Sequence, residues 1–269
     1  MKRWLKNIAA VGFLVLFLPY TATLLLSGKQ GIHKEEALPQ LEYQVLNVLM
    51  QEETSWMQES TLDLLAILCR TECVRQGEEP KGYETVQELY GAQYERLYQA
   101  VVRTQGRVIT IENEYKELPY HAVSAGVTRD GRLLGEEFSY VTSVACKKDL
   151  ESESYLQVLN LTEEELCEVL ETEVNVEELS LRRDSAEYVT HVKYQDQEWQ
   201  GEQFRALLHL TSSCFYMEET EQGIRITVKG NGHGFGISLY TADQMVQDGK
   251  ELEEIVQTFY QGAACITIS

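Results

Sequence analysis

The sequence predicts an α+β fold, in which an N-terminal transmembrane helix precedes a mixed helix and antiparallel-sheet ectodomain. A bilobed body with a groove is one form that such an ectodomain could take. Three observations predict this class. Residues 8–26 are nineteen residues without a formal charge, which is enough to span a bilayer as a helix. Apolar residues then recur at helical spacing. Farther on, short alternating runs mix with helical segments without a regular strand–helix rhythm.

The charges before the apolar run predict its orientation. Lys2, Arg3 and Lys6 precede it, so the chain is expected to start in the cytoplasm and to continue outside the cell. A cleaved signal peptide is the alternative, but its apolar region would be shorter and would end in a small-residue cleavage site. We therefore expect a single-pass protein of the cell membrane with three parts: a cytoplasmic tip and anchor over 1–27, a linker over 28–40 and an extracytoplasmic ectodomain over 41–269.

The predicted ectodomain is strongly acidic. All 43 acidic residues follow the anchor, against twenty lysines and arginines. This balance excludes nucleic acid as an expected partner, because the affinity of such complexes depends on neutralising phosphates. It also argues against adhesion to an anionic membrane surface. A neutral glycan fits better, although solubility alone would explain the charge.

Cysteine and histidine patterns predict no metal and no cofactor. The six cysteines show no CxxC or other zinc spacing, and the five histidines form no HxH or HxxxH pair. An extracytoplasmic address permits disulfides, but the sequence does not settle any pairing. We expect most of the cysteines to be small core residues.

The elements before residue 125 are predicted from spacing and caps. A helix is expected over 41–51, and Ser60 with Asp63 predicts a capping box that opens a second helix. A third helix is predicted over 91–105. The runs 107–111 and 118–124, with a polar turn between them, predict a hairpin.

The remaining elements follow the same signals. Thr162 with Glu165 predicts a capped helix that ends near Leu170. Short strands are expected over 178–200. The other expected elements are strands over 155–159, 223–229 and 263–268, and helices over 201–210, 242–249 and 252–262.

The tract Gly230–Ser238 has glycine at every second position, GNGHGFGIS. In an extended chain this pattern leaves one face without side chains and places Asn231, His233 and Phe235 on the other. The bare face would let a sugar ring or another backbone approach closely. Tight packing without any ligand is the alternative. Phosphate-binding loops are excluded, because GxxxxGK[ST] is absent and GxGxxG lacks its structural context.

The segment GNGHGFGISLYTADQMVQDGKELEEIVQTFYQG resembles the C-terminal signature of the stage II sporulation protein D family, which includes the amidase enhancer proteins. That signature is roughly G-x-G-x-G-H-G-x-G-x-S-Q-Y-G-A, followed by helices around Gly-Lys and an aromatic Tyr-x-Gly. Leu239 and Thr241 depart from it. The matching residues are Gly232, His233, Gly234, Gly236, Ser238, Tyr240, Ala242, Gly249, Tyr260 and Gly262.

Other blocks resemble the family in the same order, so the resemblance covers residues 40–265. Counting back from Arg70, in a block that resembles Ala-Arg-Thr, places the family glutamate on Glu52. Residues 121–128, HAVSAGVT, resemble H-S-T-S-G-G-R-T, with Val127 in place of arginine. The further blocks are Gln99-Ala100-Val101, Gly106-Arg107-Val108, Tyr140–Val144, and Phe204-Arg205 with Leu208–Phe215.

The resemblance implies an activity and partners. Members of this family cut peptidoglycan as lytic transglycosylases, on strands stripped of peptides, and act with a cell-wall amidase and a membrane scaffold protein during engulfment in sporulation. The implied partners are therefore glycan strands, an amidase and a scaffold. Some members hold zinc before the Q-A-V helix, but residues 82–97 contain no Cys or His, so we predict no metal here.

The implied chemistry needs one carboxyl group rather than two. It protonates the oxygen between MurNAc and GlcNAc and then takes the proton of the C6 hydroxyl, which closes a 1,6-anhydro ring. Ordinary glycosidases need a second carboxylate. The family register assigns the acid/base role to Glu52, with Glu53 as an alternative, and a solvated Glu52 without any catalytic role as another.

Five residues are carried over by motif position as substrate-binding residues that line the groove: Ser124, Thr128, Ser212, His233 and Ser238. For His233 a packed histidine bonded to backbone is an equal alternative, and His121 could be a core residue. The departures at Val127, Leu239, Thr241 and directly after Glu52 keep a second function open, a catalytically degenerate scaffold that binds glycan or activates an amidase.

Overall fold

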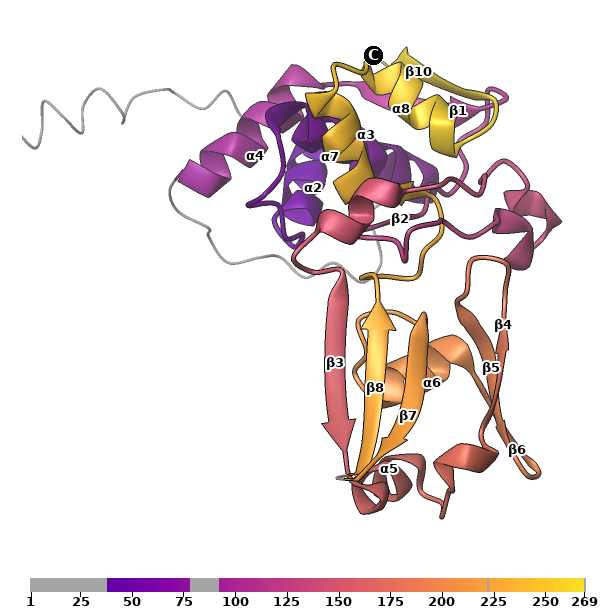
Figure 1. Cartoon of the computed structure of the whole chain (residues 1–269). Helices are drawn as coiled ribbons and strands as arrows, with labels where there is room; N and C mark the ends of the chain where they lie inside the picture. The colour runs from indigo at the N-terminus through magenta and orange to yellow at the C-terminus, as the bar shows by residue number, and fades with distance from the viewer. Residues whose placement is uncertain (1–37, 78–91, 222, 269) are drawn as a thin grey trace, which may run out of the picture. The chain divides into compact units, whose positions relative to one another are not determined.

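The computed structural model describes residues 38–77, 92–221 and 223–268, and Gln40–Ser269 forms one compact unit. The predicted anchor lies outside the described residues. Within those residues, no helix combines the length and the apolar character that a membrane crossing requires. The unit mixes helices with mostly antiparallel sheets, which confirms the α+β class (Figure 1).

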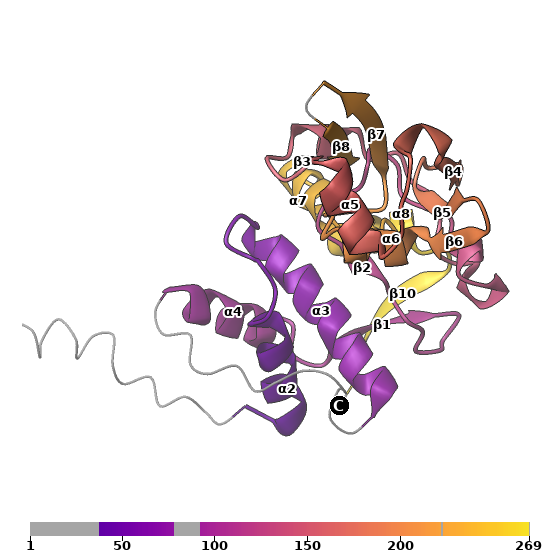
Figure 2. The ribbon, with the colours of Figure 1, turned by 90° about the horizontal axis from the view of Figure 1, so that it is seen from below.

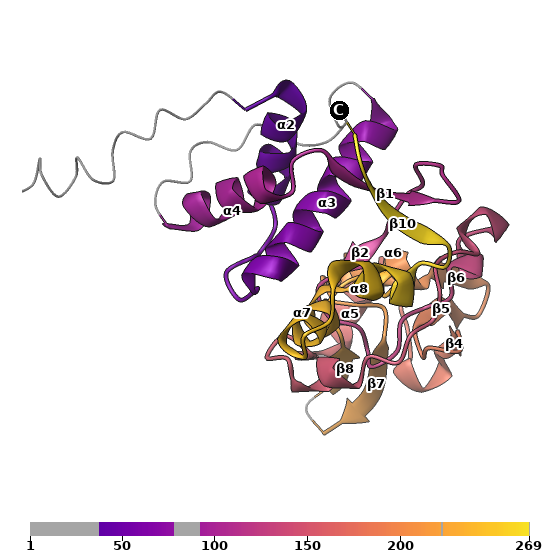
Figure 3. The ribbon, with the colours of Figure 1, turned by 90° about the horizontal axis from the view of Figure 1, so that it is seen from above.

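Three helices form one group at the start of this unit: α2 (Gln40–Leu49), α3 (Glu59–Gln76) and α4 (Ala92–Arg103). They contact one another, and α3 also contacts α7 (Leu239–Gln247). Views from below and from above place α3 between the α2–α4 pair and α7 (Figures 2 and 3). Residues 61–71 of α3 are almost all buried, because the helix is surrounded by neighbours on several sides.

Arg70 of α3 joins this helical group. Its side chain is fully buried and binds Glu42 of α2 through two nitrogens, the shorter contact being 2.7 Å. The same guanidinium donates to the carbonyls of Val101 and Arg107 and to the hydroxyl of Thr104. One cation therefore connects α2, α3, the C-terminal end of α4 and the first strand.

The predicted capping box at Ser60 is wrong. The helix begins at Glu59 with Gln58 as its N-cap residue, and no side chain of that residue caps it. Asp243 of α7 supplies the missing acceptor, since its carboxylate receives the Gln58 amide and the Thr61 hydroxyl at 2.6 Å each. A partner that lies far along the chain replaced the local cap.

The predicted hairpin of 107–111 with 118–124 is also wrong. Strand β1 (Arg107–Ile111) pairs antiparallel with β10 (Ala263–Thr267), and β2 (Tyr120–His121) pairs parallel with β9 (Ile237–Ser238). Pro119 has no amide hydrogen, so it cannot donate to a ladder with β1. Its carbonyl instead accepts from the Ile237 amide and the Tyr260 hydroxyl.

The remaining strands form two antiparallel sheets, ordered β3-β8-β7 and β4-β5-β6. They consist of β3 (Leu156–Leu161), β7 (Phe215–Thr220), β8 (Gly223–Lys229), β4 (Ser180–Arg183), β5 (Val189–Tyr194) and β6 (Gln197–Gln200). The strands expected over 155–159, 178–200 and 223–229 are confirmed. Helix α6 (Gly201–Leu207) packs between the sheets, where Phe204 stacks on Phe215 at 5.3 Å.

Three further helical and strand predictions are confirmed. The helix α5 (Glu163–Leu170) begins with the predicted Thr162–Glu165 capping box. The helix α8 (Leu252–Phe259) and strand β10 lie where expected. Short 3₁₀ helices lie at 131–133, 136–138, 147–151 and 176–178. All six cysteines are free, and Cys69, Cys73, Cys146 and Cys214 are buried as expected.

Replacing Glu42 tests the buried ion pair. Glu42→Gln would leave the Arg70 cation buried without its counter-charge, so we expect the free energy of unfolding to fall by about 3–5 kcal/mol. Glu59→Gln is the control, because Glu59 makes exposed pairs with Arg96 and Arg103 and should cost less than about 1 kcal/mol. Urea denaturation measures both, and equal losses would contradict the assignment.

Candidate active site

A cavity of about 970 Å³ opens between the helical group and the glycine tract. Its walls come from the turn after α2, one side of α3, the segment 117–122, residues 151–154 and the start of α7. Asn231 and His233 of the glycine tract also line it. Segments far apart in sequence therefore meet here, and Glu52 and His233 share one cavity.

Glu52 lies in the turn that ends α2, half-buried in the cavity wall. Its amide donates to the carbonyl of Leu49, which continues the helical turn. The Tyr120 hydroxyl, from the opposite wall, donates to Glu52 Oε1 at 2.9 Å. Burial, with the nearby Cys69 and Glu52, holds the pKa of Tyr120 far above its usual range, so the phenol keeps its proton. One carboxylate oxygen of Glu52 is thus held in place by a neutral donor.

The neighbouring Glu53 is in a different environment. Its carboxylate is exposed and accepts from the hydroxyl and the amide of Ser55, at 2.6 and 3.1 Å. These hydrogen bonds, the hydroxyl first, lower the pKa of Glu53. A carboxyl group that stays ionised is a poor proton donor. This environment disfavours Glu53 as a general acid.

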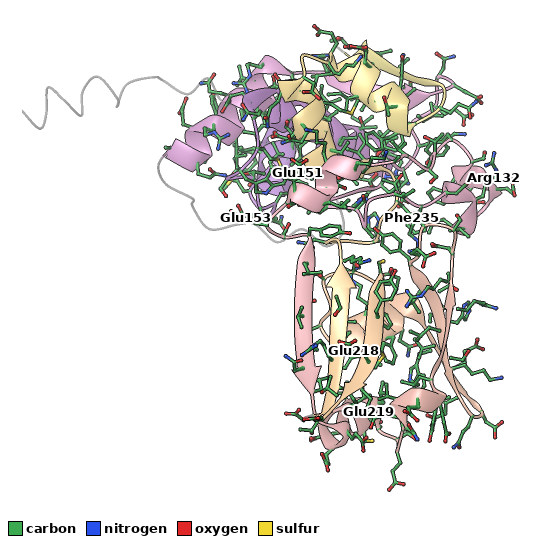
Figure 4. All side chains as sticks on the ribbon, viewed as in Figure 1. Arg132, Glu151, Glu153, Glu218, Glu219 and Phe235 are labelled. Carbon is green, nitrogen blue, oxygen red and sulfur yellow. The ribbon has the colours of Figure 1, made fainter. Side chains whose placement is uncertain are left out.

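The cavity lining is acidic. Among the described residues that line it there is no lysine and no arginine. Besides Glu52 and Glu53, four glutamates contribute: Glu72, Glu117, Glu151 and Glu153. Figure 4 shows Glu151 and Glu153 near the start of β3. Such a lining disfavours phosphate and other strongly anionic ligands, and suits uncharged sugar surfaces.

The glycine tract does not run as an extended strand with one bare face. Gly230, Gly232, Gly234 and Gly236 all have positive φ, from 69° to 118°, so the chain turns repeatedly. Each glycine presses against protein rather than against open space. A Cβ on Gly236 would lie 1.7 Å from the Pro119 carbonyl oxygen, and one on Gly234 would lie 2.4 Å from the Tyr188 ring. The alternation therefore serves close packing of the tract against its neighbours.

Four of the five predicted substrate-binding residues do not line the cavity. Ser124, Thr128, Ser212 and Ser238 are fully buried, so no ligand can touch them without a rearrangement. Their hydroxyls instead satisfy buried backbone or carboxylate groups. Ser212, for example, accepts from the Cys214 amide and donates to the Lys229 carbonyl. The prediction that they form the groove surface is corrected accordingly.

Asp149 explains why two of these serines are buried. Its carboxylate accepts from the Ser124 amide at 2.7 Å, from the Ser238 hydroxyl at 2.7 Å and from the Thr241 hydroxyl at 2.7 Å. Burial raises the pKa of Asp149, while these hydrogen bonds act in the opposite direction. The group fastens the 121–128 segment to the start of α7 and so fixes two walls of the cavity.

His233 lines the cavity, but its ring has backbone partners. Its Nδ1 accepts from the Phe235 amide at 3.1 Å. Burial lowers the pKa of His233, while a hydrogen bond to the backbone of Tyr120 acts in the opposite direction. The neighbouring His121 ring lies 5.7 Å away, centroid to centroid. His121 also lines the cavity and is 4 % exposed.

Arg129 is a residue that the motif comparison missed. It stands two positions after Val127, where the family has arginine, and its guanidinium lies over the rings of Phe235 and Tyr188 at 4.3 and 5.0 Å. It also donates to Asp184 at 2.7 Å and to the His233 carbonyl. The sequence shows a basic residue directly after the 121–128 block, but only the fold reveals what it contacts.

Within the described ranges, no cluster of three or more potential ligands could hold a metal ion.

The cavity offers the Glu52 carboxylate held by the neutral Tyr120 phenol, two histidine rings and the exposed indole of Trp56. Trp56, 37 % exposed, faces Tyr240 with ring centroids 6.0 Å apart at this cavity. Exposed aromatic faces of this kind can stack on sugar rings.

No family model matches this chain. Two relatives do. The stage II sporulation protein D of Bacillus amyloliquefaciens is 29% identical over 178 residues, which are 64% of this chain and 52% of that protein. The stage II sporulation protein D of Bacillus subtilis (strain 168) is 27% identical over 256 residues, which are 84% of this chain and 74% of that protein. The chain therefore spans about half of the first relative and about three quarters of the second, and both confirm the resemblance inferred from the motifs.

A methyl group tests the packing of the glycine tract. Gly236→Ala should lower the free energy of unfolding by at least about 3 kcal/mol, because its Cβ would overlap the Pro119 carbonyl. Gly249→Ala is the matched control, since Gly249 has φ +81° with nothing within 4 Å, and should cost only about 1–2 kcal/mol. Comparable losses in urea denaturation would contradict the packing role.

Stability should depend on pH through His121. Burial, with His233 nearby, lowers the pKa of His121 to about 3, below its ordinary value of 6.5. Between these values the unfolded chain binds a proton that the folded chain does not, so the free energy of unfolding should fall as the pH drops from 6.5 towards 3. His121→Gln should lose less stability over that window than the unsubstituted protein. Identical pH profiles in urea denaturation would contradict this assignment.

Proposed function

From the premise that this chain is a relative of the stage II sporulation proteins D, we propose that it acts on the bacterial cell wall in sporulation. More specifically, we propose a lytic transglycosylase that cleaves the bond between MurNAc and GlcNAc in peptide-free glycan strands. The products would be strands ending in 1,6-anhydro-MurNAc. The observation that carries this proposal is the placement of Glu52 in a sugar-sized cavity, with one oxygen held by Tyr120.

The proposed chemistry uses Glu52 twice. Its protonated carboxyl group first donates the proton to the glycosidic oxygen, and the bond from C1 of MurNAc to that oxygen breaks. The carboxylate then accepts the proton of the C6 hydroxyl of the same sugar, whose oxygen bonds to C1. No water is added, and Glu52 ends protonated, ready for another cycle. Tyr120 occupies Oε1, so we assign the proton transfers to Oε2.

The environment supports this single-carboxylate scheme. Glu53 is bound by Ser55, and Glu72 is bound by Arg75 and Gln76. Burial opposes the fall in the pKa of Glu72 that Arg75 and Gln76 cause. Each of these acids is thus engaged elsewhere and held in its ionised form. Glu52 differs in its position: it is half-buried and its hydrogen bond from Tyr120 comes from the opposite cavity wall, whereas Glu53 is exposed and bound by Ser55 of its own turn.

We further propose that residues 1–27 anchor the chain in the cell membrane with the enzyme unit outside. A cell-wall amidase would supply peptide-free strands, and a membrane scaffold protein would hold both enzymes together. These partners are proposed on the family resemblance.

Replacing Glu52 tests the reaction. Glu52→Gln keeps the side-chain volume and removes the acid, so release of 1,6-anhydro saccharides from peptide-free glycan should fall by at least about 10³-fold. Mass spectrometry of the soluble products measures this release. Glu219→Gln, a change on the exposed surface of β7 (Figure 4), should leave the rate unchanged.

The alternatives give other outcomes. If Glu53→Gln abolishes the product and Glu52→Gln does not, the acid is Glu53. If the unsubstituted chain binds peptide-free glycan without releasing any anhydro product, the chain is a binding or amidase-activating scaffold, and the enzymatic proposal fails.

A further inference from the structure

The two nitrogens of the His121 ring differ in their surroundings. Nδ1 lies 3.0 Å from the carbonyl oxygen of Phe235. A carbonyl oxygen only accepts hydrogen bonds, so Nδ1 carries the proton and donates. The pKa of His121 is lowered to about 3 by burial, so the ring is neutral near neutral pH. The other nitrogen, Nε2, therefore presents a lone pair and acts only as an acceptor.

That acceptor has no hydrogen-bond partner among the described residues, although it is buried. Buried polar atoms in folded proteins nearly always have a partner, so an exception calls for an explanation. His121 also lines the cavity that contains Glu52. It follows Tyr120, the residue that holds Glu52, directly in the chain. The ring that carries the unpartnered atom therefore lines the proposed active site, while the atom itself is covered, so a ligand reaches it only after a local shift of the cavity wall.

The neighbouring ring of His233 does not supply a hydrogen-bond donor to His121 Nε2. His233 lies 5.7 Å away, centroid to centroid, and its Nδ1 already accepts from the Phe235 amide. A metal ion is not favoured, because the described part of the chain offers no group of three ligands. What the position lacks is a hydrogen-bond donor.

We propose that His121 recognises the substrate, with its Nε2 accepting a hydrogen bond from an O–H or N–H group of a glycan bound beside Glu52. This inference rests on the proposed function and identifies which part of the sugar faces this wall. Hydroxyl and acetamido N–H groups can donate, whereas carboxylates and ether oxygens cannot. The atom therefore selects a neutral, donor-bearing edge of the sugar, and the lining without lysine or arginine has the same preference.

Nitrogen NMR of the full-length chain tests this contact. Glu52→Gln stops turnover, peptide-free glycan is the probe, and the Trp56 indole signal reports occupation of the cavity independently of His121. We expect the His121 Nε2 resonance to move upfield on binding, as for a nitrogen that accepts a hydrogen bond, while the ring stays neutral. A shift of the Trp56 signal without a shift of the Nε2 resonance would overturn the inference. The absence of any shift in either signal would overturn it as well.

Two substitutions separate the nitrogens. The amide of Asn can reproduce the Nδ1 donor to Phe235 but not the Nε2 acceptor, whereas the Gln amide reaches the Nε2 position and can present its oxygen there. In the Glu52→Gln background, His121→Asn should weaken glycan binding by about tenfold, and His121→Gln by less than about twofold. His191→Gln, at a histidine on β5 outside the cavity, is the control. Unchanged affinity in a folded His121→Asn variant would contradict the contact.

The outcomes distinguish the two proposals. If His121→Asn fails to fold, the resonance of the native ring still decides. If Nε2 responds to glycan but the unsubstituted chain releases no anhydro product, recognition by His121 stands and the cutting activity fails. If product is released while Nε2 does not respond, the activity stands and the inference about His121 fails.

Discussion

The buried ion pair between Arg70 and Glu42 is the constraint on which the rest of this unit depends. A guanidinium removed from water is tolerable only when its donors are satisfied, and here they bind a carboxylate, two carbonyls and a hydroxyl. These acceptors come from different elements. The arrangement therefore fixes the position of α2 within the helical group, and Glu52 lies in the turn directly after that helix.

The geometry of the candidate site then follows from two walls that are both linked to α7, one through Asp243 and the other through Asp149. The wall with Glu52 is set by the helices. The opposite wall, with Tyr120 and His121, is a two-residue strand that pairs with β9 and is fastened through Asp149. Because Tyr120 keeps its proton, the hydrogen bond across the cavity does not require Glu52 to be in one charge state. The acid and then base role that we propose for Glu52 needs a partner of that kind.

Local sequence signals predicted local structure well and long-range structure poorly. The capping box at Thr162 and strand β8 are short-range features, and both are as predicted. The N-terminus of α3 and the partner of β1 depend on Asp243 and on β10, which lie more than a hundred residues away in the chain. Spacing cannot reveal such partners. The register with the family pointed to Glu52, which lies in the cavity wall. It could not tell that Ser124 and Ser238 face a buried carboxylate, or that His121 rather than His233 has the unpartnered nitrogen.

Arg129 connects the sheets to the cavity wall through a single cation. Its charge is neutralised by Asp184, between β4 and β5, and its flat faces lie over Tyr188 and Phe235. The carbonyl of that same Phe235 holds His121 in its tautomer. The β4–β6 sheet is thus no interchangeable module. Replacing it with a sheet from another protein would require Asp184, Arg129 and Phe235 to be kept together. Exchanging the sheet alone would alter the surroundings of His121, which is distant from it in the chain.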